Sequence, residues 1–159
     1  MPNHADTLRG APVLVPKGPD LGLFGPLGLR EPAVYGTGTL ADIEELRRTV
    51  AAARGLHADC RQSNHEGVLT DAVHEARTVH RGIVINPAGY SHTSVALRDA
   101  LAAAGLPVVE VHLSDIHRRE AFRHHSHVPA VADTVICGAG AHGDAMALTH
   151  LAQLLEENR

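Results

Sequence analysis

Five short apolar segments, separated by helical or polar stretches, constrain the fold of this 159-residue chain more than any other feature. Runs of Val, Ile and Leu predict buried strands, and the amphipathic period between most of them predicts helices. The predicted strands are 13–15, 56–63, 82–86, 107–113 and 134–138, and the predicted helices are 39–54, 65–80, 92–104 and 142–157. The first helix carries a capping-box pattern in Thr39 and Asp42 and an apolar face of Leu40, Ile43, Leu46 and Val50.

This alternation predicts an α/β fold in a single domain. Apolar strands that are covered by helices on both faces form parallel sheets. The default arrangement is a doubly wound, five-stranded parallel sheet of flavodoxin-like order 2-1-3-4-5. We expect residues 1–11 to form a flexible tail and residues 12–159 to form the domain.

Composition excludes several classes of partner. The formal net charge is −4 and there is no basic block, which argues against binding to nucleic acid or to anionic membranes. No apolar run approaches the roughly 20 residues of a membrane span, and the first residues lack the apolar region of a secretory signal. Cys60 and Cys137 form no spacing motif, so we expect buried thiols in a reducing cytoplasm.

Ligands of doubly wound sheets bind outside the carboxyl ends of the strands. The residues just past the predicted strands are therefore the candidate site, and most of the polar, chemically competent residues of the chain fall there. These segments are 17–20, 63–64, 86–92, 112–114 and 138–143.

Two further motifs favour weaker interpretations. Gly138, Gly140 and Gly143 match G-x-G-x-x-G, but no strand and acidic residue follow, so a tight turn is favoured over a dinucleotide site. The histidines at 124, 125 and 127, together with His112 and His117, invite a metal hypothesis, yet H-E-x-x-H is absent. The arginines at 118, 119 and 123 favour anion binding instead.

Two residue pairs are suited to acid–base chemistry. Arg30 and Tyr35 lie in a long irregular connection, a feature that is usually a lid or a binding loop in a compact domain. Glu110 and His112 end a predicted strand and share one face of it, where a carboxylate orients an imidazole and increases its basicity.

These segments together resemble type II 3-dehydroquinate dehydratase, the type II dehydroquinase family. The resemblance spans residues 13–157 and rests on GPDLGLFG, REPAVYG, RQSNHEG, INPAGYSHTSVALRDAL and VEVHLSDIHRREAFRHHS. It implies a flavodoxin-like subunit, a homododecamer built from trimers, and neither metal nor cofactor. The implied substrate is a cyclic hydroxy-keto acid: the family converts 3-dehydroquinate to 3-dehydroshikimate by trans-dehydration through an enolate, in the shikimate pathway of aromatic biosynthesis.

The resemblance also implies the catalytic roles. Tyr35 matches the base that takes the proton alpha to the ketone. A free tyrosine has a pKa of about 10, so it needs a nearby cation; Arg30 matches the family's activating arginine, and Arg119 assists. His112 matches the acid that protonates the leaving hydroxyl, with Glu110 as its orienting partner.

The remaining implied roles concern binding. Asp99 matches an acid that reaches the site of a neighbouring subunit in the trimer. The groups that match the family's hold on the substrate carboxylate and hydroxyls are Asn86, His92, Arg123 and the backbone amides of Leu113 and Ser114.

The chain departs from the family pattern mainly in its first loop. The family's N-G-P-N-L-N-L-L-G-x-R becomes the segment from Lys17 to Arg30, with three extra residues between Gly18 and Arg30. The family's catalytic asparagine is replaced by Asp20, and like charges at about 4 Å and an effective dielectric of about 20 cost about 4 kcal/mol. That cost would slow enolate formation roughly a thousandfold.

Further on, a glycine–tyrosine pair of the family appears as Gly143-Asp144, and the tyrosine of H-H-S-Y appears as His127. Three explanations stay open at this point. In the first, Asp20 is protonated or is neutralised by Lys17, and ordinary dehydration of 3-dehydroquinate survives. In the second, the chain is a paralogue that dehydrates an amino-substituted dehydroquinate of an aminoshikimate-type pathway. In the third, it is a non-catalytic homologue that binds a small acid. The retained Tyr35 and His112 argue against the last.

Overall fold

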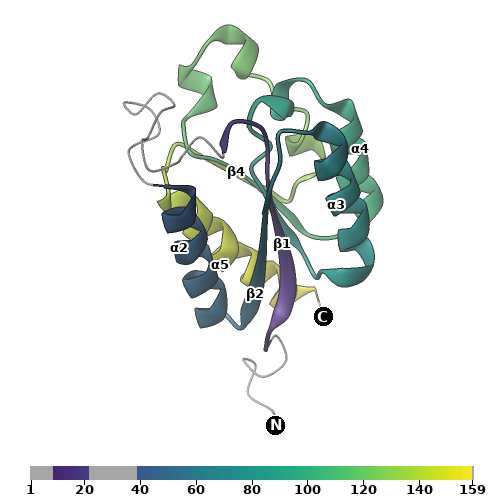
Figure 1. The fold of residues 1–159 in the computed structure, drawn as a ribbon, viewed down its shortest axis with the longest axis vertical. Helices are drawn as coiled ribbons and strands as arrows, with labels where there is room; N and C mark the ends of the chain where they lie inside the picture. The colour runs from purple at the N-terminus through teal and green to yellow at the C-terminus, as the bar shows by residue number, and fades with distance from the viewer. Residues whose placement is uncertain (1–8, 22–38, 159) are drawn as a thin grey trace.

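The computed structural model describes residues 9–21 and 39–158 of the chain, and these form one parallel sheet flanked by helices (Figure 1). The strands pair in the order β2-β1-β3-β4-β5, all parallel, which confirms the predicted fold class. They are β1 (Ala11–Lys17), β2 (Leu56–Gln62), β3 (Ile83–Ile85), β4 (Val108–His112) and β5 (Thr134–Cys137). No helix in the described part of the chain combines the length and the apolar character of a membrane-spanning segment.

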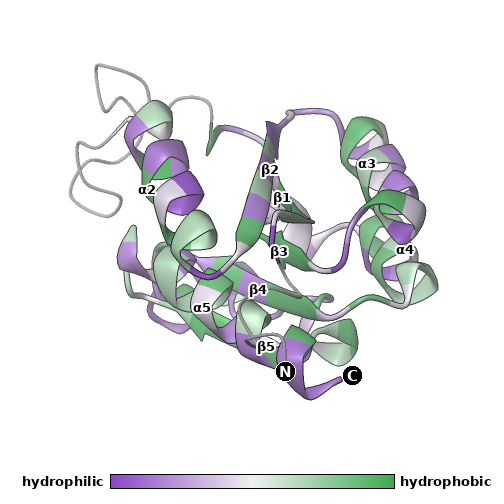
Figure 2. Cartoon of the chain, turned by 90° about the horizontal axis from the view of Figure 1, so that it is seen from below, coloured by the Kyte–Doolittle hydropathy of each residue, from purple (hydrophilic) through white to green (hydrophobic). Residues whose placement is uncertain are grey.

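Four α-helices cover the two faces of the sheet. α2 (Leu40–Ala53) and α5 (His142–Glu157) pack on one face, and α3 (Glu66–Val79) and α4 (Val95–Ala104) on the other (Figure 2). Each pair buries an apolar core against the strands, with Leu148 and Leu151 on the α5 side and Val73 and Leu101 on the α3–α4 side. The predicted capping box is confirmed, because Thr39 Oγ1 accepts from the Asp42 amide and the Asp42 carboxylate accepts from the Thr39 amide.

Short 3₁₀ turns replace a helix between β4 and β5 and extend the carboxyl edge of the sheet. They are η4 (Ile116–Arg118), η5 (Ala121–Arg123) and η6 (Pro129–Val131), and a further turn, η3 (Ala88–His92), follows β3. These turns supply most of the irregular backbone beside the strand ends, so side chains from 86–92 and 112–123 can meet there.

The carboxyl end of β1 lies against the start of η3. A Cβ atom at Gly18 would lie 2.1 Å from the carbonyl oxygen of Pro87, so only glycine fits at this position. Asp20 follows with a positive φ of 64°, a conformation that aspartate tolerates better than most residues. The backbone from Gly18 to Asp20 is therefore constrained where it leaves β1 beside η3.

A charge cluster of Lys17, Arg47 and Asp144 is buried between the sheet and the α2–α5 layer. Arg47 of α2 donates to Asp144 of α5 through Nη2 and Oδ2 at 2.7 Å, and both side chains are fully buried. The Nζ atom of Lys17, at the end of β1, is buried without a hydrogen-bond partner among the described residues. Lys17 and Asp144, two positions where the chain departs from the dehydroquinase pattern, thus belong to one cluster.

Burial, and after it the charge of Arg47, lowers the pKa of Lys17 to about 7, although Asp144, Cys60 and Glu44 act in the opposite direction. Between pH 7 and about pH 10.5 the unfolded chain therefore holds a proton on Lys17 that the folded chain does not. The free energy of unfolding should rise with pH across this window, by up to about 1.4 kcal/mol per pH unit. Urea unfolding of the wild type and of Lys17→Met from pH 6 to 10 checks this.

Lys17→Met should be more stable than the wild type at pH 6, and the difference should shrink as the pH approaches 10. A constant difference between the two proteins across the whole range would show that Lys17 does not titrate in this window.

Candidate active site

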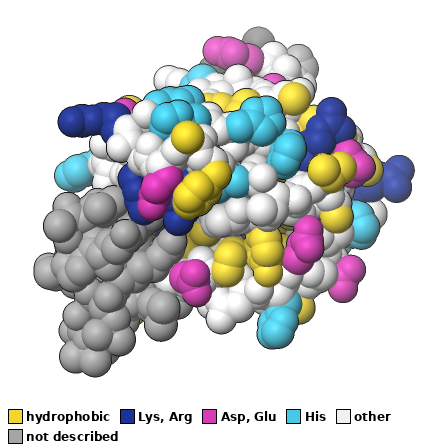
Figure 3. All heavy atoms as spheres, turned by 90° about the horizontal axis from the view of Figure 1, so that it is seen from above, with side chains coloured by type: hydrophobic (Ala, Val, Ile, Leu, Met, Phe, Trp, Pro, Cys, Tyr) yellow, Lys and Arg dark blue, Asp and Glu magenta, His cyan; other side chains and the backbone are white. Residues whose placement is uncertain are grey.

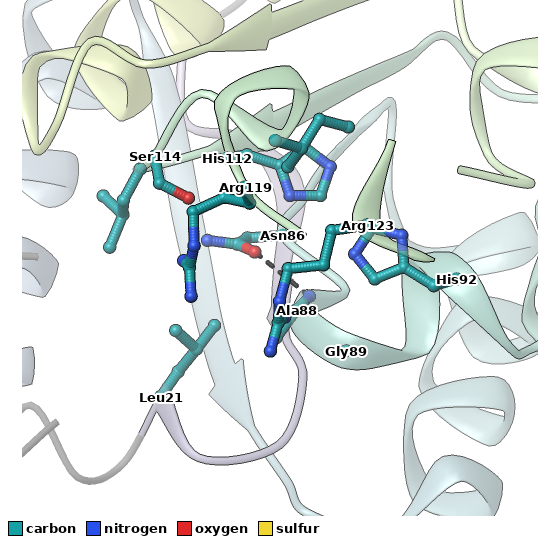
Figure 4. A pocket seen from close by; sticks show the side chains of 11 residues that line it. Leu21, Asn86, Ala88, Gly89, His92, His112, Ser114, Arg119 and Arg123 are labelled. Atoms are coloured by element: carbon teal, nitrogen blue, oxygen red, sulfur yellow. Dashed lines mark hydrogen bonds between the residues drawn. The ribbon is translucent and has the colours of Figure 1, made fainter. Parts of the chain in front are cut away.

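A pocket at the carboxyl edge of the sheet collects residues from β4, from η3 and from the 3₁₀ turns after β4. Figure 3 looks onto this end of the molecule, where several histidine side chains are exposed, and Figure 4 shows the pocket from close by. None of the lining side chains in the described part of the chain is acidic. The lining residues are Leu21, Asn86, Ala88, Gly89, His92, His112, Leu113, Ser114, Ile116, Arg119 and Arg123.

The imidazole of His112 is oriented by a hydrogen bond to Glu110. Both side chains are buried at the end of β4, and His112 Nε2 lies 2.7 Å from Glu110 Oε1. An ionised carboxylate only accepts hydrogen bonds, so Nε2 carries the proton of this bond. The other ring nitrogen, Nδ1, is then the atom of His112 that can exchange a proton with a ligand in the pocket.

His92, which also lines the pocket, is fixed as a neutral acceptor. Its Nδ1 donates to the backbone carbonyl of His125 at 2.6 Å, which leaves Nε2 without a proton. Burial lowers the pKa of His92, as do His112 and Arg123, against the opposing hydrogen bond to His125 and the charge of Glu110. A neutral Nε2 at this position can accept a hydrogen bond from a ligand hydroxyl.

Two guanidinium groups give the pocket its positive charge. Arg119 and Arg123 both pair with Glu120, at 3.6 Å and 2.9 Å. A hydrogen bond from its own backbone amide, and then the charges of Arg123 and Arg119, lower the pKa of the Glu120 carboxyl. Arg123 also stacks over the exposed Phe122 ring, 5.2 Å from its centroid. Because Glu120 itself does not line the pocket, an anionic ligand meets the two cations directly (Figure 4).

Polar groups from neighbouring strand ends complete the pocket. Asn86 is buried after β3, and its Oδ1 accepts from the Ala88 amide at 3.1 Å, so its Nδ2 group is left to donate to a ligand. Leu113 and Ser114 follow β4, where the Leu113 carbonyl accepts from Gly140. Together with His92, His112, Arg119 and Arg123, seven residues singled out from the sequence line one pocket.

Other predicted residues lie elsewhere. Asp20 is exposed and does not line the pocket; its amide donates to Asn64 Oδ1 at 3.0 Å, and it precedes Leu21, which does line it. Asp99 is exposed on α4 and pairs with Arg98 at 2.8 Å, outside the pocket. Arg30 and Tyr35 fall outside the described residues.

Sequence reasoning missed several residues that shape the site. Leu21, Ala88, Gly89 and Ile116 supply its apolar walls and carry no chemical signal of their own, although three of them lie within or beside the predicted strand-end segments. In the described part of the chain, no group of three or more His, Cys, Asp or Glu side chains is placed to hold a metal ion.

A family model described as Dehydroquinase class II matches residues 11–152. The chain belongs to the class II dehydroquinase family. The 3-dehydroquinate dehydratase of Streptomyces avermitilis is 57% identical to this dehydroquinase over 154 residues, covering 96% of this chain and 95% of the relative. The 3-dehydroquinate dehydratase 2 of Pseudomonas aeruginosa is also 57% identical, over 91% of this chain and 95% of its own.

One of the similar proteins is named as a catabolic enzyme. The catabolic 3-dehydroquinase 2 of Aspergillus flavus is 51% identical over 87% of this chain and 90% of its own. Among solved structures, the type II dehydroquinase of Propionibacterium acnes superimposes with a TM-score of 0.85 at 39% identity, over 91% of this dehydroquinase and 98% of that chain.

Proposed function

We propose that this dehydroquinase removes water from 3-dehydroquinate to give 3-dehydroshikimate, as a step of the shikimate pathway. The observation that carries the proposal is the pocket itself, where a carboxylate-backed histidine faces two arginines, a neutral histidine and an asparagine. An anionic hydroxy-keto acid finds partners for its carboxylate and its hydroxyls there. The relatives named above support the choice of substrate.

The reaction divides between two proton-transfer groups. Tyr35, activated by Arg30 with the help of Arg119, takes a proton alpha to the ketone and leaves an enolate. His112, protonated on Nδ1, gives that proton to the departing hydroxyl, which leaves as water. Glu110 stabilises the imidazolium through Nε2, and this orientation agrees with the hydrogen bond between them.

Binding groups hold the ring while the protons move. In this proposal Arg123, Asn86 and His92 bind the carboxylate and hydroxyls, together with the backbone amides of Leu113 and Ser114; the support is that all five residues line the pocket. The chemistry needs no redox partner, because the substrate loses one hydrogen from carbon and one hydroxyl and is neither oxidised nor reduced overall.

An absorbance assay for the conjugated enone product tests the proposal. The purified protein should turn over 3-dehydroquinate, and borohydride treatment in the presence of substrate should leave it active, since no Schiff base forms. Tyr35→Phe keeps the ring and loses the base, so it should leave no measurable turnover. Inactivation by borohydride, or full activity of Tyr35→Phe, would refute the mechanism.

Asp20 supports a second candidate substrate, an amino-substituted dehydroquinate whose ammonium group an aspartate would attract. The side chain is solvent-exposed and precedes Leu21, which lines the pocket, so the support lies in the charge of Asp20 next to a lining residue. Turnover of both substrates should be compared. Comparable rates on 3-dehydroquinate and poor rates on the amino analogue would remove this candidate.

Asp20→Asn should raise kcat on 3-dehydroquinate if the carboxylate repels the developing enolate. The increase is up to about a thousandfold for a charge at about 4 Å and smaller for a more distant one. Steady-state kinetics at low and high salt measure it, because a solvent-exposed charge is screened by salt. A further loss of activity would instead mean that the carboxylate has its own role.

We also propose that the protein works as a trimer-based dodecamer in which Asp99 completes the site of a neighbouring subunit. Its side chain is 61% exposed on α4 and lies outside the pocket of its own chain, which leaves it available to a neighbour. Asp99→Ala alone and His112→Ala alone should both be nearly inactive. Mixed oligomers of the two should regain activity, because some sites then hold both residues; if mixing restores nothing, Asp99 does not act across an interface.

A further inference from the structure

We propose that Ser126 is a positioning residue for the acid: its hydroxyl holds the carboxylate of Glu110 and, through it, controls when His112 carries the proton that it donates. This inference deepens the proposed dehydration at the same site. It rests on contacts among three side chains that come from β4 and from the segment before η6.

The hydroxyl of Ser126 has a defined direction. Its Oγ lies 2.7 Å from Glu110 Oε1 and also accepts from the backbone amide of Val128 at 3.3 Å. Because the Val128 amide supplies a proton to Oγ, the hydroxyl proton of Ser126 is left for the carboxylate. The neighbouring His127 amide donates to the Ser91 carbonyl at 2.8 Å and so anchors this segment against η3.

The carboxylate of Glu110 depends on these few bonds. Its side chain is fully buried, and its second oxygen, Oε2, has no hydrogen-bond partner among the described residues. His112 and Ser126 both donate to Oε1, and within residues 9–21 and 39–158 Ser126 gives the only bond to this carboxylate that does not come from the acid itself. A buried carboxylate with a single donor is held in its charged form less strongly than one with two.

The effect on His112 follows from charge. The imidazolium form is stabilised by a negative Glu110, so weakening that charge releases the proton from His112 at lower pH. Other titratable or charged groups around His112 are His92, Arg119 and Arg123 in the pocket and Cys137 on the paired strand β5. Variants of Ser126 leave all four in place.

The test compares Ser126→Ala with Ser91→Ala. Ser91, on η3, is fully buried whereas Ser126 is half-buried, and the Ser91 hydroxyl has no partner among the described residues, so Ser91→Ala is a control for the loss of a serine hydroxyl as such. Ser126→Ala should lower kcat on 3-dehydroquinate by about tenfold to a hundredfold with little change in KM. In Ser126→Ala, the decrease of kcat at high pH should also begin at a lower pH than in the wild type. Ser91→Ala should have the kcat and the pH profile of the wild type.

Two further variants and one direct readout make the result decisive. Ser126→Thr keeps the hydroxyl and should retain the wild-type profile, while Ser126→Cys, a weaker donor, should shift it in the same direction as alanine by less. NMR titration of the His112 ring in the ligand-free protein gives a readout that is independent of turnover. Its midpoint should lie at a lower pH in Ser126→Ala than in the wild type. Reduced kcat with an unmoved pH profile and an unmoved midpoint would overturn the proposal, as would unchanged kcat.

The readouts separate this inference from the proposed function. If the wild type fails to dehydrate 3-dehydroquinate, the proposed function fails, but the NMR midpoint of His112 still reports whether Ser126 acts on it. If the wild type is active and neither the profile nor the midpoint responds to Ser126, only the positioning role fails.

Discussion

His112→Ala should lose turnover of 3-dehydroquinate by about a hundredfold to ten-thousandfold, the range over which a positioned general acid contributes. The variant keeps the binding groups at Asn86, Arg119 and Arg123, so KM should change far less than kcat. It also leaves Glu110 buried with Ser126 as its donor, which should lower the free energy of unfolding by about 1–3 kcal/mol without abolishing folding.

Steady-state kinetics with circular dichroism and thermal unfolding check this expectation. His117→Ala is the local control, because His117 is exposed on η4 and does not line the pocket. The control should keep wild-type kcat. Retention of more than a tenth of wild-type kcat by His112→Ala would show that another group supplies the proton to the leaving hydroxyl.

Asp144→Asn should be the most destabilising single change in the described part of the chain away from the site. It leaves Arg47, and with it Lys17, buried without a negative partner, and breaking a buried ion pair by removing one member costs about 3–5 kcal/mol. Domains are stable by about 5–15 kcal/mol in total, so the variant should unfold at markedly lower denaturant concentration.

A double variant gives this prediction its control. Lys17→Met in the Asp144→Asn background removes one of the two buried cations and should restore part of the lost stability. Glu45→Gln breaks an exposed ion pair with Arg48, 3.8 Å long, and should change stability by less than about 1 kcal/mol. If Asp144→Asn lowers the free energy of unfolding no more than Glu45→Gln does, the charge cluster does not stabilise the fold.

The sequence was a good guide to the sheet because its strands are buried on both faces. Continuous apolar runs such as 82–86 and 107–113 have few alternatives to central parallel strands, and the structure confirms their pairing. The strand-end rule then located the pocket without any coordinates, since chain direction fixes which end of each strand carries the ligand groups. Asn86, His112 and Ser114 were predictable for this reason.

What the sequence did not reveal depends on contacts between distant segments. The apolar face predicted for α2 contains Ile43, yet the same face also buries Arg47, whose partner Asp144 is 97 residues away and has no local signature. Ser126 reaches Glu110 only because the 3₁₀ turns after β4 bring the chain back to that strand. Neither contact has a periodicity or a spacing that a reader of the sequence could use.

The stereochemistry of proton loss tests the central claim most directly. The purified protein should be given 3-dehydroquinate that carries deuterium at one of the two hydrogens alpha to the ketone, in each configuration separately, and the product should be analysed by mass spectrometry. A base and an acid on opposite faces of the ring predict loss of the hydrogen that is trans to the departing hydroxyl, with the other hydrogen retained. Loss of the cis hydrogen, or of both at random, would contradict a mechanism in which Tyr35 takes the proton and His112 releases the water.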